Sequence, residues 1–452
     1  MQYFIISFIV LYLSFLLFKK ASGSMALTRL NMISYIFYFY LVIQTFIAVL
    51  LAVNHLDENS YIALCSDETK IYAWLSVLYA MIVLPLGMLI ATKLLNVTSV
   101  KSLFNQYTFN HISNFISRKD SYIRIFLYLF SVLAIFSTIY TLIKLRHAPL
   151  FAVFEGFDPI ILAKYRIEAS RGFEGNIYIK NILAKMLTPV MAYIFYSYWR
   201  NTRYRKDLVW FLIMFVTTFF ILTYNIAKAP FIEFLIGFIF LSVLAKGKVK
   251  LRTILSCALI APFLIVLLWI FIMGLDDITK IFSLNYGPLK RIIFGQITGL
   301  FLMLEIFPSS HEFILGRSVS RILSALFGFQ YIQGAHRIIM EFVNPAAVKL
   351  GTAGVMCTLF VGDAWANFGL IGILISPIYV GILTQLFYLY FLKSKKTPIH
   401  LGLFTYLSVH NFVSAGFVSV YIYNAGIFAL VLIFVIIAIF AKVNRKIFQH
   451  SV

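Results

Sequence analysis

Charged residues are scarce in this chain of 452 amino acids: Asp, Glu, Lys and Arg make up only 12% of it, whereas ordinary soluble domains contain about 25%. Hydrophobic residues account for 62% of the sequence, which excludes a soluble globular protein. Apolar runs of roughly 17–25 residues recur between short basic clusters, and each can cross about 30 Å of hydrocarbon as a helix. Runs such as 208–224 are continuously apolar, which excludes a β-barrel. The sequence therefore predicts an all-α, polytopic bundle of transmembrane helices.

Sequence signatures for metals and nucleotides are also missing. The three cysteines (Cys65, Cys257 and Cys357) stand at unrelated spacings and predict neither a disulfide framework nor a metal site. The chain has no Walker A loop, no His-Glu-x-x-His, no Gly-x-Ser-x-Gly and no Asp-x-Asp or Glu-x-Asp pair. We expect no cofactor and no metal, and ATP-driven transport is not indicated.

Acidic residues are fewer than basic ones, 17 against 38, and the formal net charge is +21. Much of the surplus lies in short connections, where it sets membrane topology, and we do not expect nucleic-acid binding. About eleven spans are expected, at 2–18, 30–53, 71–92, 123–143, 181–199, 208–224, 230–245, 253–273, 358–390, 400–420 and 424–441. The basic connections then fall on one side, the cytoplasm, so the N-terminus is outside, the C-terminus is inside and the first span is an uncleaved anchor.

The whole chain, 1–452, is expected to form a single integral membrane domain with two long segments on its outer face, 144–180 and 274–357. Both segments are rich in arginine, although long loops cross the membrane whatever their charge and the topology rule requires no arginine there. An anionic ligand is the leading explanation. The alternative is that the arginines only meet lipid headgroups.

In the first outer segment, Asp158-Pro159 and Arg171-Gly172 are start and stop signals that predict a helix from 159 to 171. Arg166 falls in its apolar stripe, whereas Glu168 and Arg171 share the opposite face. A guanidinium in an apolar stripe needs a carboxylate or phosphate partner, and its planar fork suits phosphate. Snorkelling or a structural salt bridge is the alternative.

The second outer segment contains two further candidate helices. Residues 316–323 read as an amphipathic helix with Arg317 and Arg321 on its polar side, which is either a ligand site or an interfacial helix. Arg291 precedes an apolar stretch, 292–307, that predicts a re-entrant or interfacial helix. Lys228 stands at a tight outer turn between two spans, where it either binds an anion or snorkels.

Candidate bases are few on the outer face. Asp363 opens the span at 358–390, where a charge is costly unless it is paired or functional. His336, next to Arg337, and Glu168 are the other candidates, and a structural ion pair explains each as well. Asn367 and Gln296 are candidate partners for sugar hydroxyls, or polar contacts between helices.

Several of these segments resemble the O-antigen polymerases of the Wzy type, also called oligosaccharide repeat unit polymerases. The resemblance covers about a third of the chain and rests on Leu162 to Gly172, Lys228-Ala229-Pro230, Arg291 to Gln296, Asn344-Pro345, Gly351 to Gly354, and Gly362 to Gly369 with Gly372. It implies a glycosyltransferase of the bacterial inner membrane with a GT-C-like helical architecture. Such enzymes transfer a growing glycan from undecaprenyl pyrophosphate to a lipid-linked repeat unit at the periplasmic face.

We expect the arginines to hold the pyrophosphate and to stabilise its charge as the glycosidic bond breaks. Arg166 and Arg291 would act with one of Arg317, Arg321 or Arg337, with Arg171 and Lys228 as further cationic contacts. Asp363, Glu168 or His336 would accept the proton of the acceptor hydroxyl. The expected partners are the lipid-linked donor and acceptor, membrane lipid and a chain-length regulator protein.

Two other functions fit parts of the same pattern. An O-antigen ligase uses the same donor with a lipid A core acceptor, and the loop arginines do not separate it from a polymerase. A flippase for lipid-linked oligosaccharides would carry cations inside its spans and two related halves. Lys185 is nearly alone within a span and no repeat is visible, so the flippase is the weaker alternative.

Overall fold

The computed structural model describes residues 2–56, 61–113, 118–153, 155–157, 159–227, 229–256, 259, 283–284, 287–319, 321–410, 417–422, 424, 426–436 and 439. Within these ranges the regular structure is helical and no strand is present, which confirms the all-α prediction. Seven helices of the described chain are long and apolar enough to cross a membrane. They run over Gln2–Arg29, Met32–Val53, Asp67–Leu94, Ile123–Ile143, Arg205–Thr223, Ala229–Lys246 and Phe360–Lys393. This is the character of a multi-pass helical membrane protein.

The remaining predicted spans are only partly described. The segment predicted at 181–199 is helical, as η4 (Ile179–Met186) continues into α9 (Leu187–Thr202). The segment predicted at 400–420 is helical in α19 (Pro398–Val409), and 411–416 lie outside the described residues. Most of 253–273 and the end of 424–441 also lie outside them. The total number of spans stays a prediction.

The chain divides into two compact units. Unit 1 comprises Met1–Gln106, Lys248–Lys393 and Asn411–Tyr423, and unit 2 comprises Tyr107–Gly247, Ser394–His410 and Asn424–Val452. The second outer segment therefore belongs to unit 1 and the first outer segment to unit 2.

Unit 1 is built on the packing of α4 (Asp67–Leu94) against α18 (Phe360–Lys393). A Cβ atom on Gly87 would overlap the carbonyl oxygen of Ile378, and one on Gly381 would overlap that of Leu84, so both positions require glycine. The N-terminal helix α1 (Gln2–Ser22) packs on α4, where the Trp74 indole N–H donates to Ser7 at 2.8 Å. α2 (Met32–Tyr35), η2 (Ile36–Phe46) and α3 (Ile47–Val53) follow as one nearly continuous helix.

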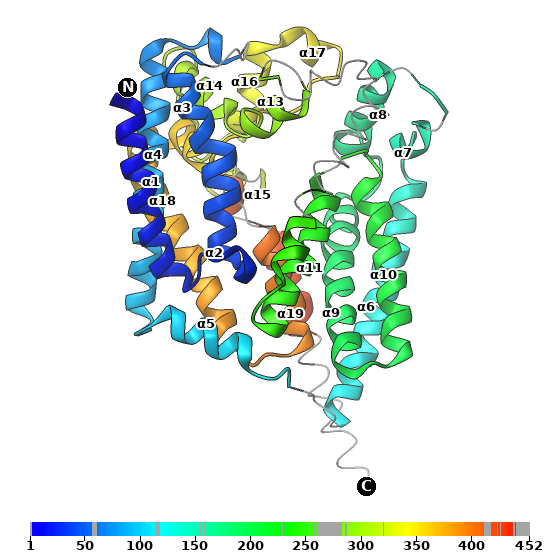
Figure 1. The fold of residues 1–452 in the computed structure, drawn as a ribbon. Coiled ribbons are helices and arrows are strands. Elements are labelled where there is room, and N and C mark those ends of the chain that lie inside the picture. Colours follow the sequence, from blue (N-terminus) through cyan, green and yellow to red (C-terminus); the bar gives the residue numbers. More distant parts are fainter. Residues whose placement is uncertain are drawn as a thin grey trace. The chain divides into compact units, whose positions relative to one another are not determined.

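Four short helices lie at the end of unit 1 where α1 and α4 begin (Figure 1). They are α13 (Gly287–Ile293), α14 (Thr298–Ile306), α16 (Ala335–Val343) and α17 (Pro345–Lys349). α14 is almost entirely buried and contacts both α4 and α18. Gly362 permits this contact, because a Cβ atom there would lie 3.2 Å from the Cα of Leu300.

Two sequence predictions for the second outer segment are wrong. The stretch 292–307 is not one re-entrant or interfacial helix, because the chain turns at 294–297 between α13 and α14. The stretch 316–323 is not one helix either: Leu315 and Gly316 have φ values of 55° and 77°, which end helical geometry there. The helix α15 runs only from Arg321 to Leu326.

Unit 2 contains α6 (Arg118–Ile143), α7 (Pro149–Ala152), α8 (Pro159–Arg171), η4, α9, α10 (Arg205–Thr223), α11 (Ala229–Lys246) and α19. The bounds of α8 confirm the helix predicted from 159 to 171. α9, α10 and α11 meet in an aromatic core where the Tyr193 hydroxyl donates to the Phe234 carbonyl at 2.7 Å. The Leu150 N–H of α7 donates to the Tyr224 carbonyl, so α7 is bonded to the end of α10.

Candidate functional site

The helix α18 is interrupted at Gly369, whose φ of 58° and ψ of −142° are not helical. This break releases carbonyl groups that would otherwise accept hydrogen bonds within the helix. The Ala366 carbonyl accepts from the Ile314 N–H at 2.9 Å, and the Asn367 carbonyl accepts from the Leu315 N–H at 3.0 Å. We call residues 313–317 the arginine loop. The break in α18 therefore creates the docking site for this loop.

Asn367 connects the arginine loop to the first turns of α18. Its side chain is fully buried, and its Oδ1 accepts from the Gly316 N–H at 3.0 Å. Its Nδ2 donates to the Asp363 carbonyl at 2.7 Å and lies 3.4 Å from Asp363 Oδ1. The sequence left two roles open for Asn367, and these contacts make it a polar link between segments.

Asp363 lies at the centre of this arrangement and is 4% exposed. Its Oδ2 accepts from the Val418 N–H of η6 (Val418–Ile422) at 2.9 Å. Among the described residues no Lys, Arg or His lies within ion-pair distance of this carboxylate, so neutral donors hold it. A buried ionisable group in a spanning helix is expensive and marks a functional-site candidate.

Arg317 is half-buried and is fixed by the loop that carries it. Its Nε donates to the Ile314 carbonyl at 3.0 Å, and its Nη2 donates to the Phe313 carbonyl at 3.3 Å. No carboxylate of the described chain lies within ion-pair distance of it. The positive charge of Arg317 is therefore oriented by backbone dipoles and is not neutralised by an acid.

Arg291 ends α13 and is exposed. Burial raises the pKa of the Cys357 thiol, and the positive charge of Arg291 offsets part of that rise, so the two side chains are neighbours. The Cys357 carbonyl accepts from the Gly299 N–H at 3.0 Å, which fixes the approach to α18 against α14. Gln296 lies in the turn that separates α13 from α14.

The two candidates on α16 differ in exposure. Arg337 is exposed and its Nε lies 3.8 Å from Glu341, one turn further along the helix. His336 is half-buried, and its carbonyl accepts from the Met356 N–H at 3.3 Å. α16 contacts α14 and α18, so both residues belong to the group of elements around the beginning of α18.

The candidates of unit 2 contact segments outside α8, the helix that carries them. The Arg166 Nε donates to the Asn225 carbonyl, which follows α10, at 3.1 Å. Glu168 lies 3.7 Å from Nδ1 of His147, whose ring stacks on Tyr165 with centroids 4.1 Å apart. Lys180 is buried and donates to the carbonyls of Ala169 and Ser170, which stabilises the end of α8.

Three candidate side chains, those of Lys228, Arg171 and Arg321, lie outside the described part of the chain. Lys228 lies outside the described residues, as does Asp158, the predicted start signal of α8. Arg171 and Arg321 lie at helix ends, but their side chains are outside the described part of the chain. Their predicted roles stay predictions.

A half-buried acid–histidine pair in unit 2 was missed by the sequence reasoning. Glu233 of α11 lies 3.3 Å from Nδ1 of His410, which follows α19, and the two side chains are 27% and 16% exposed. His410 Nε2 is buried and has no hydrogen-bond partner among the described residues. One signal was available: Glu233 is an acid inside a predicted span, where a charge needs a partner.

No group of three or more His, Cys, Asp or Glu side chains in the described chain is arranged to hold a metal ion. Comparison with known protein families, with curated proteins and with solved structures finds no match.

Proposed function

We propose that this protein is a surface-polysaccharide polymerase of the bacterial inner membrane. It would transfer a growing glycan from undecaprenyl pyrophosphate to a lipid-linked repeat unit at the periplasmic face, with a GT-C-like fold of about eleven spans. The observation that carries the proposal is the linked set Arg317, Asn367 and Asp363, which combines a buried carboxylate with an arginine that has no acidic partner among the described residues. The resemblance of Gly362 to Gly369, which include Asp363 and Asn367, to Wzy-type polymerases agrees with it.

The arginine loop would bind the pyrophosphate of the donor. A guanidinium that is already oriented by two backbone carbonyls loses little freedom when it binds a phosphate. Its N–H groups form a planar fork that donates to the phosphate oxygens. Arg291 adds a second positive charge from α13. Positive charge fixed before the reaction stabilises the negative charge that develops on a leaving pyrophosphate.

Asp363 would serve as the base. The acceptor hydroxyl oxygen attacks the anomeric carbon of the donor, its proton passes to the carboxylate, and the bond between the anomeric carbon and the pyrophosphate oxygen breaks. The products are the elongated glycan on the acceptor lipid and undecaprenyl pyrophosphate. The Val418 N–H and the Asn367 amide orient the carboxylate for this transfer.

Arg166 of unit 2 stays a pyrophosphate contact predicted from the sequence. Its Nε is bonded to a backbone carbonyl at the end of α10, which is the same kind of anchoring as that of Arg317. Glu168 is the weaker candidate base, because His147 already lies beside it. His336 stays a second candidate base in unit 1.

A flippase for lipid-linked oligosaccharides is the second candidate function, and the break in α18 favours it. Interrupted helices with buried polar groups near the break form the substrate sites of many transporters. An O-antigen ligase would use the same donor chemistry and differ only in its acceptor. The three functions therefore predict different products in a cell.

The test is the surface-glycan profile of a strain that lacks this gene, separated by repeat number on a gel. A polymerase predicts single repeat units on lipid A core and no ladder, because flipping and ligation still operate. Polymer that accumulates on the periplasmic lipid carrier would instead indicate a ligase. Single units retained on the cytoplasmic side would indicate a flippase, and an unchanged ladder would exclude all three.

A further inference from the structure

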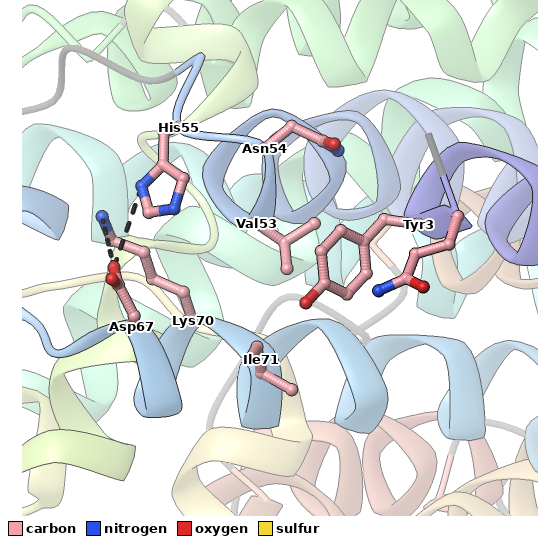
Figure 2. Close-up of a pocket in the computed structure, with 8 residues that line it drawn as sticks. Tyr3, Val53, Asn54, His55, Asp67, Lys70 and Ile71 are labelled. Carbon is pink, nitrogen blue, oxygen red and sulfur yellow. Dashed lines mark ion pairs between the residues drawn. The ribbon is translucent and has the colours of Figure 1, made fainter.

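A cavity of about 460 Å³ lies in unit 1 between the beginning of α1, the end of α3 and the first turns of α4 (Figure 2). Eight residues line it: Gln2, Tyr3, Val53, Asn54, His55, Asp67, Lys70 and Ile71. None of them belongs to the arginine loop or to α18. The volume is within the range of sites that hold small molecules, roughly 300–1,000 Å³.

The charges in this cavity compensate one another. Asp67 Oδ1 lies 3.8 Å from His55 Nδ1 and 3.8 Å from Lys70 Nζ, and Figure 2 shows both side chains directed at the carboxylate. Lys70 is 9% exposed, so its ammonium group is held beside Asp67. Asp67 and Lys70 supply one negative and one positive charge, which offset each other. The cavity therefore favours neither an anion nor a cation.

The rest of the lining combines amides, a phenol and apolar surface. The Asn54 Nδ2 donates to the Leu50 carbonyl at 2.8 Å, which leaves its Oδ1 to accept a hydrogen bond, and Gln2 supplies a second amide. The Tyr3 ring packs edge-on against Trp74 with centroids 5.1 Å apart, so this ring is held in place. The fixed Asn54 amide, the Gln2 amide and the Asp67 carboxylate can bind hydroxyl groups, while the Tyr3 ring and Val53 provide apolar contact.

His55 lies just beyond the end of α3 and lines the cavity. Its φ of 54° lies in the left-handed region. This conformation caps α3, since the His55 N–H donates to the Ala52 carbonyl at 3.1 Å and the Leu56 N–H donates to the Leu51 carbonyl at 2.9 Å. Here the left-handed turn directs the imidazole toward Asp67 across the cavity (Figure 2).

The first turn of α4 is also fixed to the elements around α18. The Ser66 N–H and hydroxyl donate to the Glu305 carboxylate of α14 at 3.0 and 3.1 Å. Burial raises the pKa of Glu305, but hydrogen bonds from Thr69 and Ser66 lower it by more, and its net pKa lies below the ordinary value. Glu305 is thus a charged anchor that ties the wall of the cavity to α14.

We propose that this cavity binds a neutral, hydroxyl-rich ligand, a sugar unit of a glycan. The preference for a neutral hydroxyl ligand rests on the lining alone. The assignment of that ligand to the glycan substrate rests on the proposed function, and it makes the cavity a glycan subsite separate from the arginine loop. The subsite would hold a sugar residue of the chain while the pyrophosphate lies at Arg317.

The experiment is a titration of the full-length protein in phosphatidylcholine nanodiscs, which avoid sugar-based detergents. Saturation-transfer NMR would measure the binding of a panel of methyl glycosides of neutral hexoses and N-acetylhexosamines. Asn54→Leu and Gln2→Leu each remove one amide, and each should raise the Kd of the bound glycoside about five- to tenfold. Gln106→Leu removes an exposed amide of α5 (Val100–Phe109) and should leave the Kd unchanged.

Three outcomes would overturn the proposal: no saturable binding of any glycoside, equal affinity in all three variants, or displacement of the glycoside by inorganic pyrophosphate. Because Gln2 is exposed at the start of α1, its variant tests the site even where Asn54→Leu fails to fold. Binding is measured here without turnover. An unchanged ladder in the deletion strain would end the polymerase proposal and leave the binding result intact.

Discussion

Arg317 of unit 1 and Arg124 of unit 2 are both part-buried, and they are held in opposite ways. In unit 1, Arg317 is fixed by the carbonyl groups of Ile314 and Phe313. In unit 2, Arg124 lies 3.2 Å from the carboxylate of Asp207, which is 1% exposed and also accepts from Thr202. A backbone carbonyl orients a guanidinium without cancelling its charge, whereas a carboxylate cancels it. The comparison indicates that the charge of Arg124 stabilises the helices of unit 2 and that the charge of Arg317 stays available to a ligand.

The same contrast holds for the acids. Asp363 in unit 1 is held by a backbone N–H and an amide, whereas Asp207, Glu168 and Glu233 in unit 2 lie beside arginine or histidine. An acid that already has a cationic partner is a poorer proton acceptor. Substitutions of these residues test whether this difference separates structural charges from reactive ones.

The largest effect is expected for Arg124→Ala. In this variant the carboxylate of Asp207, which is buried in α10, loses its cation. The guanidinium that lies 4.4 Å from the ring of Tyr198 is also lost. Loss of one partner from a buried ion pair lowers the free energy of unfolding by about 3–5 kcal/mol. Denaturant unfolding of the solubilised protein would measure it.

Arg146→Ala is the matched control. Its pair with Glu174 has side chains that are 72% and 55% exposed, and such pairs contribute roughly 0–1 kcal/mol. Equal losses in the two variants would show that the buried pair has no special structural role.

Arg317→Ala should have the next largest effect, and on activity. Removal of one preorganised donor to a developing negative charge lowers turnover about 10²–10³-fold. Stability should change little, because the docking bonds of the arginine loop come from backbone groups. The measurement is the glycan ladder in a deletion strain that expresses the variant.

Arg337→Ala provides the comparison within the same outer segment. Arg337 is exposed and lies beside Glu341, so its loss should leave the ladder unchanged. Arg317→Lys keeps the charge but not the fork and should give an intermediate product. A normal ladder from Arg317→Ala would remove Arg317 from the site.

Glu233→Gln should lower the free energy of unfolding of unit 2 by about 1–3 kcal/mol, because it replaces the charged partner of His410 by a neutral amide. Polymer length should stay normal. Thermal unfolding and the ladder, measured on the same variant, separate the two effects. Loss of polymer with unchanged stability would contradict the comparison, since unit 2 would then supply a reacting group.

Backbone carbonyls hold the charge of Lys396 in unit 2, as they hold that of Lys180. Its Nζ donates to the carbonyls of Thr108, Asn110 and Ala245 at 2.9, 2.8 and 3.2 Å, and burial lowers its pKa to about 8. In the unfolded chain the pKa of lysine is 10.5, so the unfolded state binds more protons between pH 8 and 10.5. The free energy of unfolding contributed by Lys396 therefore rises with pH in that window.

Lys396→Met lacks this titration and is the reference. The melting temperature of the wild type relative to the variant should rise by on the order of a degree or two from pH 8 to pH 10.5. A constant difference across the window would show that Lys396 keeps its proton in the folded state.

The helices were largely predictable from the sequence because their signals are local. The helix α8 has a Pro signal at its start and a Gly signal after its end, and these predicted its bounds. A long apolar run that begins near Asp363 predicted α18. The arginine loop was not predictable, because the bond from the Gly316 N–H to Asn367 joins residues 51 positions apart. An amphipathic pattern across 316–323 predicted a helix that two left-handed residues prevent.

The candidate site was predictable in its residue types and not in their pairing. Asp363, Asn367 and Arg317 were all selected from the sequence, and the fold links them through the break at Gly369. Glu168 was selected on the same grounds, yet it lies beside His147, some 20 residues away on another segment. Composition identifies costly charges, and only tertiary contacts show which of them are neutralised.

The smallest effect is expected for Glu168→Gln, and this variant tests the comparison most directly. Glu168 and His147 are 38% and 49% exposed, so the loss of their 3.7 Å contact should change the free energy of unfolding by less than about 1 kcal/mol. The His147 ring stays stacked on Tyr165, which holds the segment in place. If the base lies in unit 1, the glycan ladder of this variant is normal while that of Asp363→Asn is lost. The reverse result would place the base on α8. The reactive acid would then be the carboxylate beside a histidine, and not the one held by backbone donors.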